Sequence, residues 1–218
     1  MSAAQESLSL EMVGLIGLGA FAAVAIDLTW QIVRHFTVMA HEGAHAVLGS
    51  LMGRGVDGIT INTQAEGGTN VGPGGRLGSV AIGFAGYMGP SAFGLGAAGL
   101  INLGHSAAVL WVMLFLLALL LFALRWSFGI LTVILAGAIV FLVGFFAPMQ
   151  AQVVAGYAIT WLLLLSGIRR IVEVGLKSQD GIDLRGLTHI PHLIWSLLWL
   201  AGSFGALIFG AKLLIMST

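Results

Sequence analysis

The sequence contains no cysteine and very few charged residues. Its 218 residues include nine Lys or Arg, nine Asp or Glu, and no Cys. The absence of cysteine excludes disulfides, thiolate metal sites and cysteine nucleophiles. Any metal site must therefore use His, Asp or Glu ligands. The balanced formal charge argues against nucleic acid as a partner.

The sequence also lacks an internal repeat, a low-complexity tract and a hydrophilic domain. Residues 1–12 have no basic run and carry Glu6 and Glu11, which argues against a cleaved signal peptide. We therefore expect the first apolar run to remain as a helix, and we expect a single domain over residues 1–218.

Long apolar runs dominate what is present. Hydrophobic residues make up 58% of the chain and charged residues 8%, more apolar surface than a soluble core of this size can bury. Several runs approach or exceed the roughly 18 apolar residues that cross a bilayer. The sequence predicts an all-α polytopic membrane protein with six to seven transmembrane helices. The runs cover about 8–28, 30–52, 78–103, 105–124, 127–147, 150–168 and 193–215.

The third run, 78–103, is rich in glycine and contains Pro90. Proline inside a helix removes a hydrogen bond, so we expect a kink or a break there, with Gly89-Pro90-Ser91 as a candidate cavity wall. Whether this run spans the membrane or re-enters it stays open. Asp27, between the first two runs, is interpreted as an interfacial cap.

Two polar regions, about 54–77 and 169–192, interrupt the apolar runs. Residues 59–62 alternate apolar and polar side chains, as a strand does, and residues 66–70 are typical of a turn. We expect a short β-hairpin or a re-entrant loop here. It is either an edge strand that pairs with an extended substrate or a plain surface loop.

Basic residues indicate the orientation. If all seven runs span the membrane, most of the Lys and Arg residues lie in loops on the same side as the N-terminus. The positive-inside rule then places that side in the cytoplasm. These residues are Arg54, Arg76, Arg125, Arg169, Arg170, Lys177 and Arg185. The opposite side has Arg34 and Lys212. Both polar regions would then meet in the cytoplasmic half, together with the end of the second run.

The second run carries HEGAH, residues 41–45. On a helix, His41 and His45 stand one turn apart on one face and can share a metal ion. Glu42 can reach a water on that metal and act as a general base. Charged and imidazole side chains are costly at membrane depth, which favours a functional explanation over two packed histidines.

Two histidines do not complete a catalytic zinc site, which usually has three protein ligands. Asp180 is the preferred third ligand because Gly181 lets the backbone bend tightly behind it. Asp183, Glu173 and the pair His189 and His192 stay open as alternatives. If they do not bind a metal, Asp180 and Asp183 belong to a solvated turn with a helix cap.

Three segments resemble the site-2-protease class, the M50 intramembrane zinc metalloproteases, and most of all their short bacterial M50B-like branch. His41-Glu42-x-x-His45 is similar to the zinc and base motif of that family. Residues 85–91, AGYMGPS, resemble its Gly-Pro segment, and Asp180-Gly181 resembles its Leu-Asp-Gly motif with Gln179 in place of leucine. The family often has Asn three residues after the Gly-Pro proline, where this chain has Phe93.

The resemblance implies zinc-assisted peptide hydrolysis in a multi-pass protein of a bacterial plasma membrane. His41, His45 and Asp180 would hold Zn²⁺, Glu42 would move the proton, and the substrate would be a membrane-spanning or membrane-adjacent segment of another protein. Two other classes stay open, a catalytically silent membrane scaffold and a metal-ion transporter. A transporter would be expected to have further intramembrane carboxylates or histidines along a path.

Overall fold

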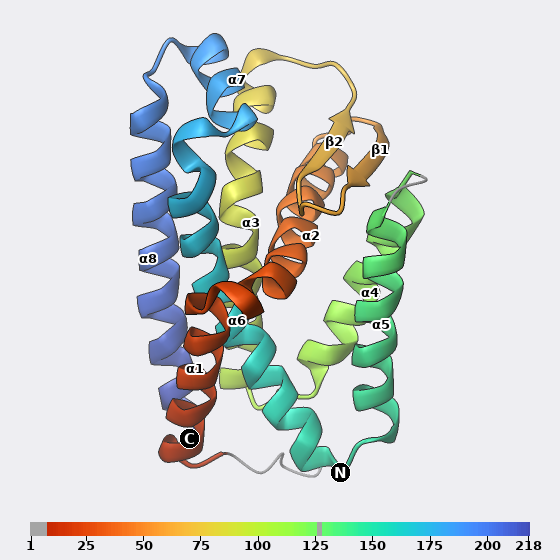
Figure 1. Ribbon diagram of the computed structural model, residues 1–218, viewed down its shortest axis with the longest axis vertical. Helices are drawn as coiled ribbons and strands as arrows, with labels where there is room; N and C mark the ends of the chain where they lie inside the picture. The colour runs from red at the N-terminus through yellow and green to blue at the C-terminus, as the bar shows by residue number, and fades with distance from the viewer. Residues whose placement is uncertain (1–7, 126–127) are drawn as a thin grey trace.

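The computed structural model describes residues 8–125 and 128–218, which form eight α-helices, a short 3₁₀ turn and one β-hairpin (Figure 1). The predicted all-α fold with a hairpin after the HEGAH helix is confirmed. Expectations for residues 1–7 lie outside the described residues. The elements are α1 (Leu10–Ala25), α2 (Asp27–Leu51), β1 (Val56–Ile61), β2 (Gly67–Val71), α3 (Arg76–Asn102), α4 (Ala108–Ala123), α5 (Phe128–Phe146), α6 (Met149–Val174), η1 (Gly175–Lys177), α7 (Gln179–Thr188) and α8 (His192–Met216).

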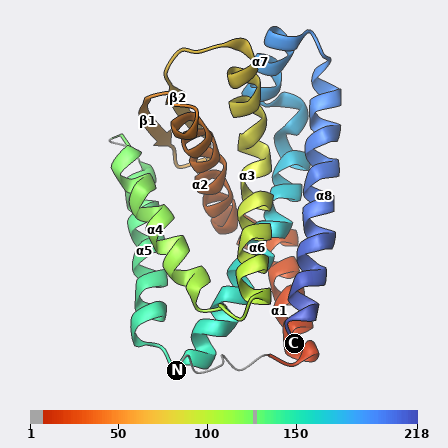
Figure 2. The same cartoon turned by 180° about the vertical axis from the view of Figure 1, so that it is seen from behind.

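The helices α3, α6 and α8 pack side by side, and the antiparallel pair α4 and α5 lies apart from them (Figures 1 and 2). The helix α2 crosses obliquely between these two groups. The hairpin and α7 lie at one end of the molecule, while the start of α1 and the end of α8 lie at the other (Figure 1). The two polar regions of the sequence therefore do meet at one end.

Fewer helices than predicted have the length and composition of a membrane span. Within the described residues, three qualify: α5, α6 with its continuation to Lys177, and α8. A fourth qualifies if α1 and α2 are counted as one bent span. The prediction of six to seven spans was too high by this measure. At 1.5 Å per residue, the 16 residues of α4 reach only about 24 Å, and glycine dilutes the hydropathy of α3.

The axes of α1 and α2 meet at 98°, with a break at Ile26. The second apolar run therefore does not fold back beside the first, as separate spanning segments would. As a result, α1 begins at the end of the molecule opposite the hairpin (Figure 1). The expectation that the start of the chain shares a side with the hairpin is wrong, as far as α1 shows it.

The hairpin pairs β1 with β2 in antiparallel register, with Ile59 opposite Thr69 and Ile61 opposite Gly67. Residues directly opposite each other lie on the same face of a sheet. Ile59 and Ile61 are fully buried in an apolar cluster with residues of α2, α4 and α5, so this face is turned inward. The burial of the two isoleucines fixes which face of the hairpin packs against the helices.

Two other expectations are corrected. The helix α3 continues through Pro90, so the run 78–103 is not broken there, and Gly89-Pro90-Ser91 is buried helix and not a cavity wall. The helix α6 extends to Val174, so Arg169, Arg170 and Glu173 are helical and the polar loop begins later than residue 169.

Candidate metal centre

The two histidines of HEGAH lie on one face of α2, where the helix meets α3 and α7. His45 and Glu42 are buried, and the side chain of His41 is 13% exposed. The Nε2 atoms of His41 and His45 are 3.1 Å apart. The i and i+4 spacing has therefore brought both imidazole nitrogens to one point, as the sequence predicted.

Asp180 joins them from the first turn of α7. Its Oδ2 atom lies 3.0 Å from His41 Nε2 and 3.5 Å from His45 Nε2. The helix begins there because the Ser178 hydroxyl caps it, accepting a hydrogen bond from the backbone N–H of Gly181. Within the described residues, these three side chains are the one His, Asp or Glu group that could hold a metal ion.

The alternative third ligands lie outside this group. Asp183 accepts a hydrogen bond from the Gln179 side chain at 2.8 Å, and Glu173 accepts one from Arg170 at 3.2 Å. Neither His189 nor His192 belongs to the group. Among the candidates considered from the sequence, the structure brings Asp180 alone to the two histidines.

The tautomer of His45 is set by its other ring nitrogen. Nδ1 lies 2.8 Å from the backbone oxygen of Ile82 in α3. Because a carbonyl oxygen only accepts hydrogen bonds, Nδ1 carries the proton in neutral His45 and Nε2 presents a lone pair. Second partners of this kind orient histidines that bind metals.

His41 is oriented by aromatic packing. Its ring meets Tyr87 edge to face, with centroids 4.6 Å apart, and Tyr87 packs on Trp199 at 4.4 Å. The indole N–H of Trp199 donates to the backbone oxygen of Phe84 at 3.1 Å. Trp199 is fully buried, and α8 thereby supports the side chain of a candidate ligand.

A glycine in α3 makes room for both rings. A β-carbon on residue 86 would lie 2.3 Å from His45 Nε2 and 2.7 Å from His41 Cε1, closer than atoms can approach. Gly86 thus allows α3 to pass directly beside the two imidazoles.

The three side chains fit a zinc ion. Ligands about 2.0–2.1 Å from a tetrahedral zinc lie about 3.3 Å from each other, and the separations of 3.0, 3.1 and 3.5 Å match that spacing. Two imidazole nitrogens and one carboxylate oxygen are also donors that zinc accepts.

Asp180 is charged in this setting. Burial alone would raise the pKa of its carboxyl, but hydrogen bonds from the rings of His41 and His45 in their protonated form, and the positive charge of those rings, hold the pKa below its ordinary value. Asp180 therefore offers a carboxylate, the form that binds a cation.

The Glu42 carboxylate contacts the hairpin. The Thr69 hydroxyl donates a hydrogen bond to Glu42 Oε2 at 2.6 Å. A β-carbon on Gly67 would lie 2.3 Å from Glu42 Oε1. Strand β2 therefore packs directly on the carboxylate beside the histidines.

Comparison with protein families gives one match. The sequence profile of the Peptidase M50B-like family matches residues 15–210, which is most of the chain. This chain belongs to the Peptidase M50B-like family. Comparisons with curated proteins and with solved structures give no match. The resemblance read from HEGAH, the Gly-Pro segment and Asp180-Gly181 is confirmed at the level of the family.

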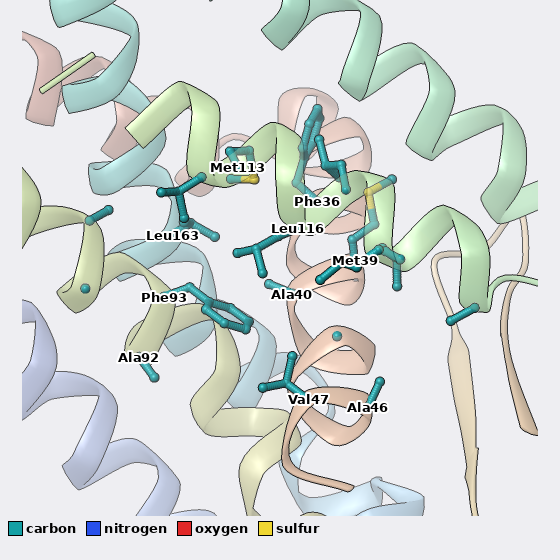
Figure 3. A pocket seen from close by; sticks show the side chains of 18 of the residues that line it. Phe36, Met39, Ala40, Ala46, Val47, Ala92, Phe93, Met113, Leu116 and Leu163 are labelled. Atoms are coloured by element: carbon teal, nitrogen blue, oxygen red, sulfur yellow. The ribbon is translucent and has the colours of Figure 1, made fainter. Parts of the chain in front are cut away.

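This M50B-like chain also has an apolar cavity of about 690 Å³ beside α2, between α3, α4 and α6 (Figure 3). Except for Ser50, the side chains that line it are hydrophobic. They include Phe36, Met39, Phe93, Met113, Leu116 and Leu163. Phe93, which stands where the family often has Asn, lines this cavity.

Sequence reasoning missed Thr69, Gly67 and the buried role of Trp199 in the M50B-like chain. Period-two alternation shows that residues 67 and 69 share a face of a strand. It does not show that α2 covers that face. The contact joins segments that are 27 residues apart, and local sequence patterns do not report such packing.

Proposed function

We propose that this M50B-like chain is an intramembrane zinc metalloendopeptidase that hydrolyses peptide bonds in or near the transmembrane segments of other membrane proteins. One observation carries the proposal. His41, His45 and Asp180 converge at zinc-like spacing, and the neighbouring Glu42 carboxylate is buried on the same helix.

Each residue has a proposed role. His41, His45 and Asp180 bind the metal, the Ile82 carbonyl orients the ring of His45, and Gly86 leaves room for both rings. Bound zinc would polarise the scissile carbonyl and lower the pKa of water toward 7. Glu42 takes the proton from the attacking water and passes one to the leaving amine.

The hairpin supports an extended substrate beside β2. The backbone N–H of Arg125 donates to the oxygen of Ile59 at 2.8 Å, so the Ile59 backbone points away from β2. In antiparallel pairing, the backbone of the opposite residue, Thr69, then points away from β1, to the outer edge of the sheet. The β1 edge is thus covered by Arg125, whereas the β2 edge, next to Glu42, is available for strand addition.

The apolar cavity supports a substrate from the bilayer. Gly43, the residue after Glu42, lines it together with Ile59 of β1. A segment whose backbone pairs with the hairpin could place apolar side chains there. The lining is mostly hydrophobic, and the cavity of about 690 Å³ has the size of an ordinary ligand site, about 300–1,000 Å³.

The two other function classes fit less well. A transporter path would need further ligand clusters, and the described residues hold one such group. A silent scaffold would have no use for a buried carboxylate, which is costly to keep. Glu42 is nevertheless buried and hydrogen-bonded to Thr69.

We further propose that the hairpin end of the molecule faces the cytoplasm. Arg54, Arg76, Arg125, Lys177 and Arg185 all lie at or beside the ends of elements there (Figure 1). The positive-inside rule places such an end in the cytoplasm. The candidate metal centre would then lie in the cytoplasmic half of the membrane, and α1 would begin on the opposite side.

Metal analysis of the purified protein in detergent, with a peptide assay beside it, tests the proposal. We expect one zinc per chain in the wild type and in Glu42→Gln, and no stoichiometric zinc in His45→Ala or Asp180→Ala. Asp183→Ala is the matched control and should keep its zinc. A library of synthetic single-span peptides in the same detergent provides the substrates, and its best-cleaved member serves as the reporter peptide.

Glu42→Gln should cleave none of the peptides while it retains its metal. A wild type without stoichiometric zinc would refute the proposal. Cleavage by Glu42→Gln at the wild-type rate would refute the assigned role of that residue.

A further inference from the structure

Strand β2 contacts the two oxygens of the Glu42 carboxylate in different ways. Thr69 donates a hydrogen bond to Oε2 at 2.6 Å, and its Oγ1 also lies 3.3 Å from the Glu42 backbone oxygen. Among the described residues, Thr69 provides the one hydrogen bond to this carboxylate. Oε1 lies against Gly67, where a β-carbon would come within 2.3 Å. One oxygen is held by a hydrogen bond, and the other packs on Gly67, where the absence of a side chain allows the close approach.

The contact of Thr69 and Gly67 with Glu42 follows from the way the hairpin packs on α2. Gly67 and Thr69 share one face of β2, and their partners across the hairpin are Ile61 and Ile59. Both isoleucines are fully buried, which fixes this face against α2. Hydrogen bonds to a carboxylate are short and roughly twice as strong as those between neutral groups, so the Thr69 hydroxyl can hold one rotamer of Glu42.

We propose that Thr69 is a positioning residue for Glu42. Its hydrogen bond to Oε2, together with the close packing of Oε1 on Gly67, holds the carboxylate in one rotamer beside the histidines that are proposed to bind the metal. The inference rests on the proposed function, in which Glu42 is the general base. A base that is held in one rotamer needs no reorganisation at the moment of proton transfer.

The first test is kinetic. In the wild-type background, Thr69→Val removes the hydroxyl with little change of shape. We expect its kcat on the reporter peptide to fall roughly tenfold or more with KM within about twofold, as for other outer-shell partners. Zinc content should not change. Thr69→Ser, which restores the donor, should recover most of the rate.

Thr60→Val is the matched control. Thr60 lies on the other strand of the same hairpin, is exposed, and does not contact Glu42. It should behave as the wild type. Gly67→Ala forms a second arm, because its added methyl group would press on Oε1, and it too should lower kcat. Equal rates for Thr69→Val and the wild type, or no recovery with Thr69→Ser, would overturn the inference.

The second test needs neither metal nor activity. The infrared carboxylate band of Glu42 in the metal-free protein is obtained as the difference between wild type and Glu42→Gln. This band should shift in Thr69→Val and stay in place in Thr60→Val. An unshifted band overturns the positioning role. Absence of zinc and cleavage in the wild type, with a shifted band, would instead refute the proposed function and leave the contact established.

Discussion

Arg169 of α6 forms an ion pair with Asp27 at the bend where α1 ends and α2 begins. The same guanidinium donates to the backbone oxygens of Val24 and Ala25, and its Cζ lies 4.9 Å from the centre of the Trp30 ring. The last turn of a helix leaves carbonyl oxygens without partners inside the helix. One arginine from a distant helix supplies the missing donors at this bend.

The first prediction follows from the difference in exposure between the side chains of Arg169, which is mostly buried, and Asp27, which is exposed. Arg169→Met leaves two carbonyl oxygens without a donor, and we expect a loss of about 2 kcal/mol or more in the free energy of unfolding. Asp27→Asn removes only the exposed side of the pair and should cost at most about 1 kcal/mol. Unfolding in mixed detergent micelles, followed by circular dichroism, measures both. Equal losses in the two variants would show that the carbonyl contacts contribute nothing.

This bend also shows what the sequence could not predict. The long apolar runs at about 8–28 and 30–52 predict helices, which the structure has at Leu10–Ala25 and Asp27–Leu51. The same pattern is compatible with two antiparallel spans or with one bent pair. The bend is held by Arg169 of α6, which lies 142 residues further along the chain than Asp27. Arg169 was expected in a loop, which hid this contact, and counting the first two runs as separate spans led to the wrong side for the start of α1.

The candidate metal centre, too, could be predicted from the sequence only in part. His41 and His45 could be predicted together because the helical repeat alone brings them to one face. The placement of Asp180 depended on Gly181 and on a family resemblance. The roles of Thr69 and Gly86 could not be predicted from the residues around them. Both residues contact α2 from other elements, and the helical repeat of α2 does not show which elements pack against it.

The second prediction concerns two arginines that hold opposite ends of the hairpin. Arg170 donates to the Ala65 oxygen in the turn at 3.1 Å, and Arg125 donates to the Asp57 oxygen in β1 at 2.8 and 3.0 Å. We expect Arg170→Met to speed amide hydrogen exchange at residues 62–66, and Arg125→Met to speed it at residues 56–58. Each variant is the control for the other. Faster exchange along the whole hairpin in both would show that it moves as one unit.

The third prediction tests the glycine beside the imidazoles. Gly86→Ala places a methyl group where His45 Nε2 and His41 Cε1 now lie. We expect the affinity for zinc to fall roughly tenfold or more, because both rings must move. Gly99→Ala is the matched control on the same helix, since nothing lies within 4 Å of its added β-carbon. Competition with a fluorescent zinc chelator gives both affinities, and a wild-type affinity in Gly86→Ala would contradict the tight approach of α3.

The fourth prediction concerns the glycine behind Asp180. A β-carbon on residue 181 would lie 2.0 Å from His192 Nε2, so the His192 ring occupies the space that any other residue would need. Gly181→Ala must therefore push apart α8 and the first turn of α7, and Asp180 moves with that turn. We expect the affinity for zinc to fall roughly tenfold. His192→Ala alone should keep zinc affinity within about threefold, because His192 is not a member of the ligand group.

The double variant distinguishes a steric cause from any other. Removing the His192 ring opens the space that the new methyl group needs, so Gly181→Ala with His192→Ala should bind zinc more tightly than Gly181→Ala alone. Contacting residues couple in this way, and a double-mutant cycle measures the coupling. If the double variant binds as weakly as Gly181→Ala, the glycine is required for the backbone conformation of the turn, and His192 is a bystander. Recovery would mean that the glycine beside Asp180 is there for packing against α8.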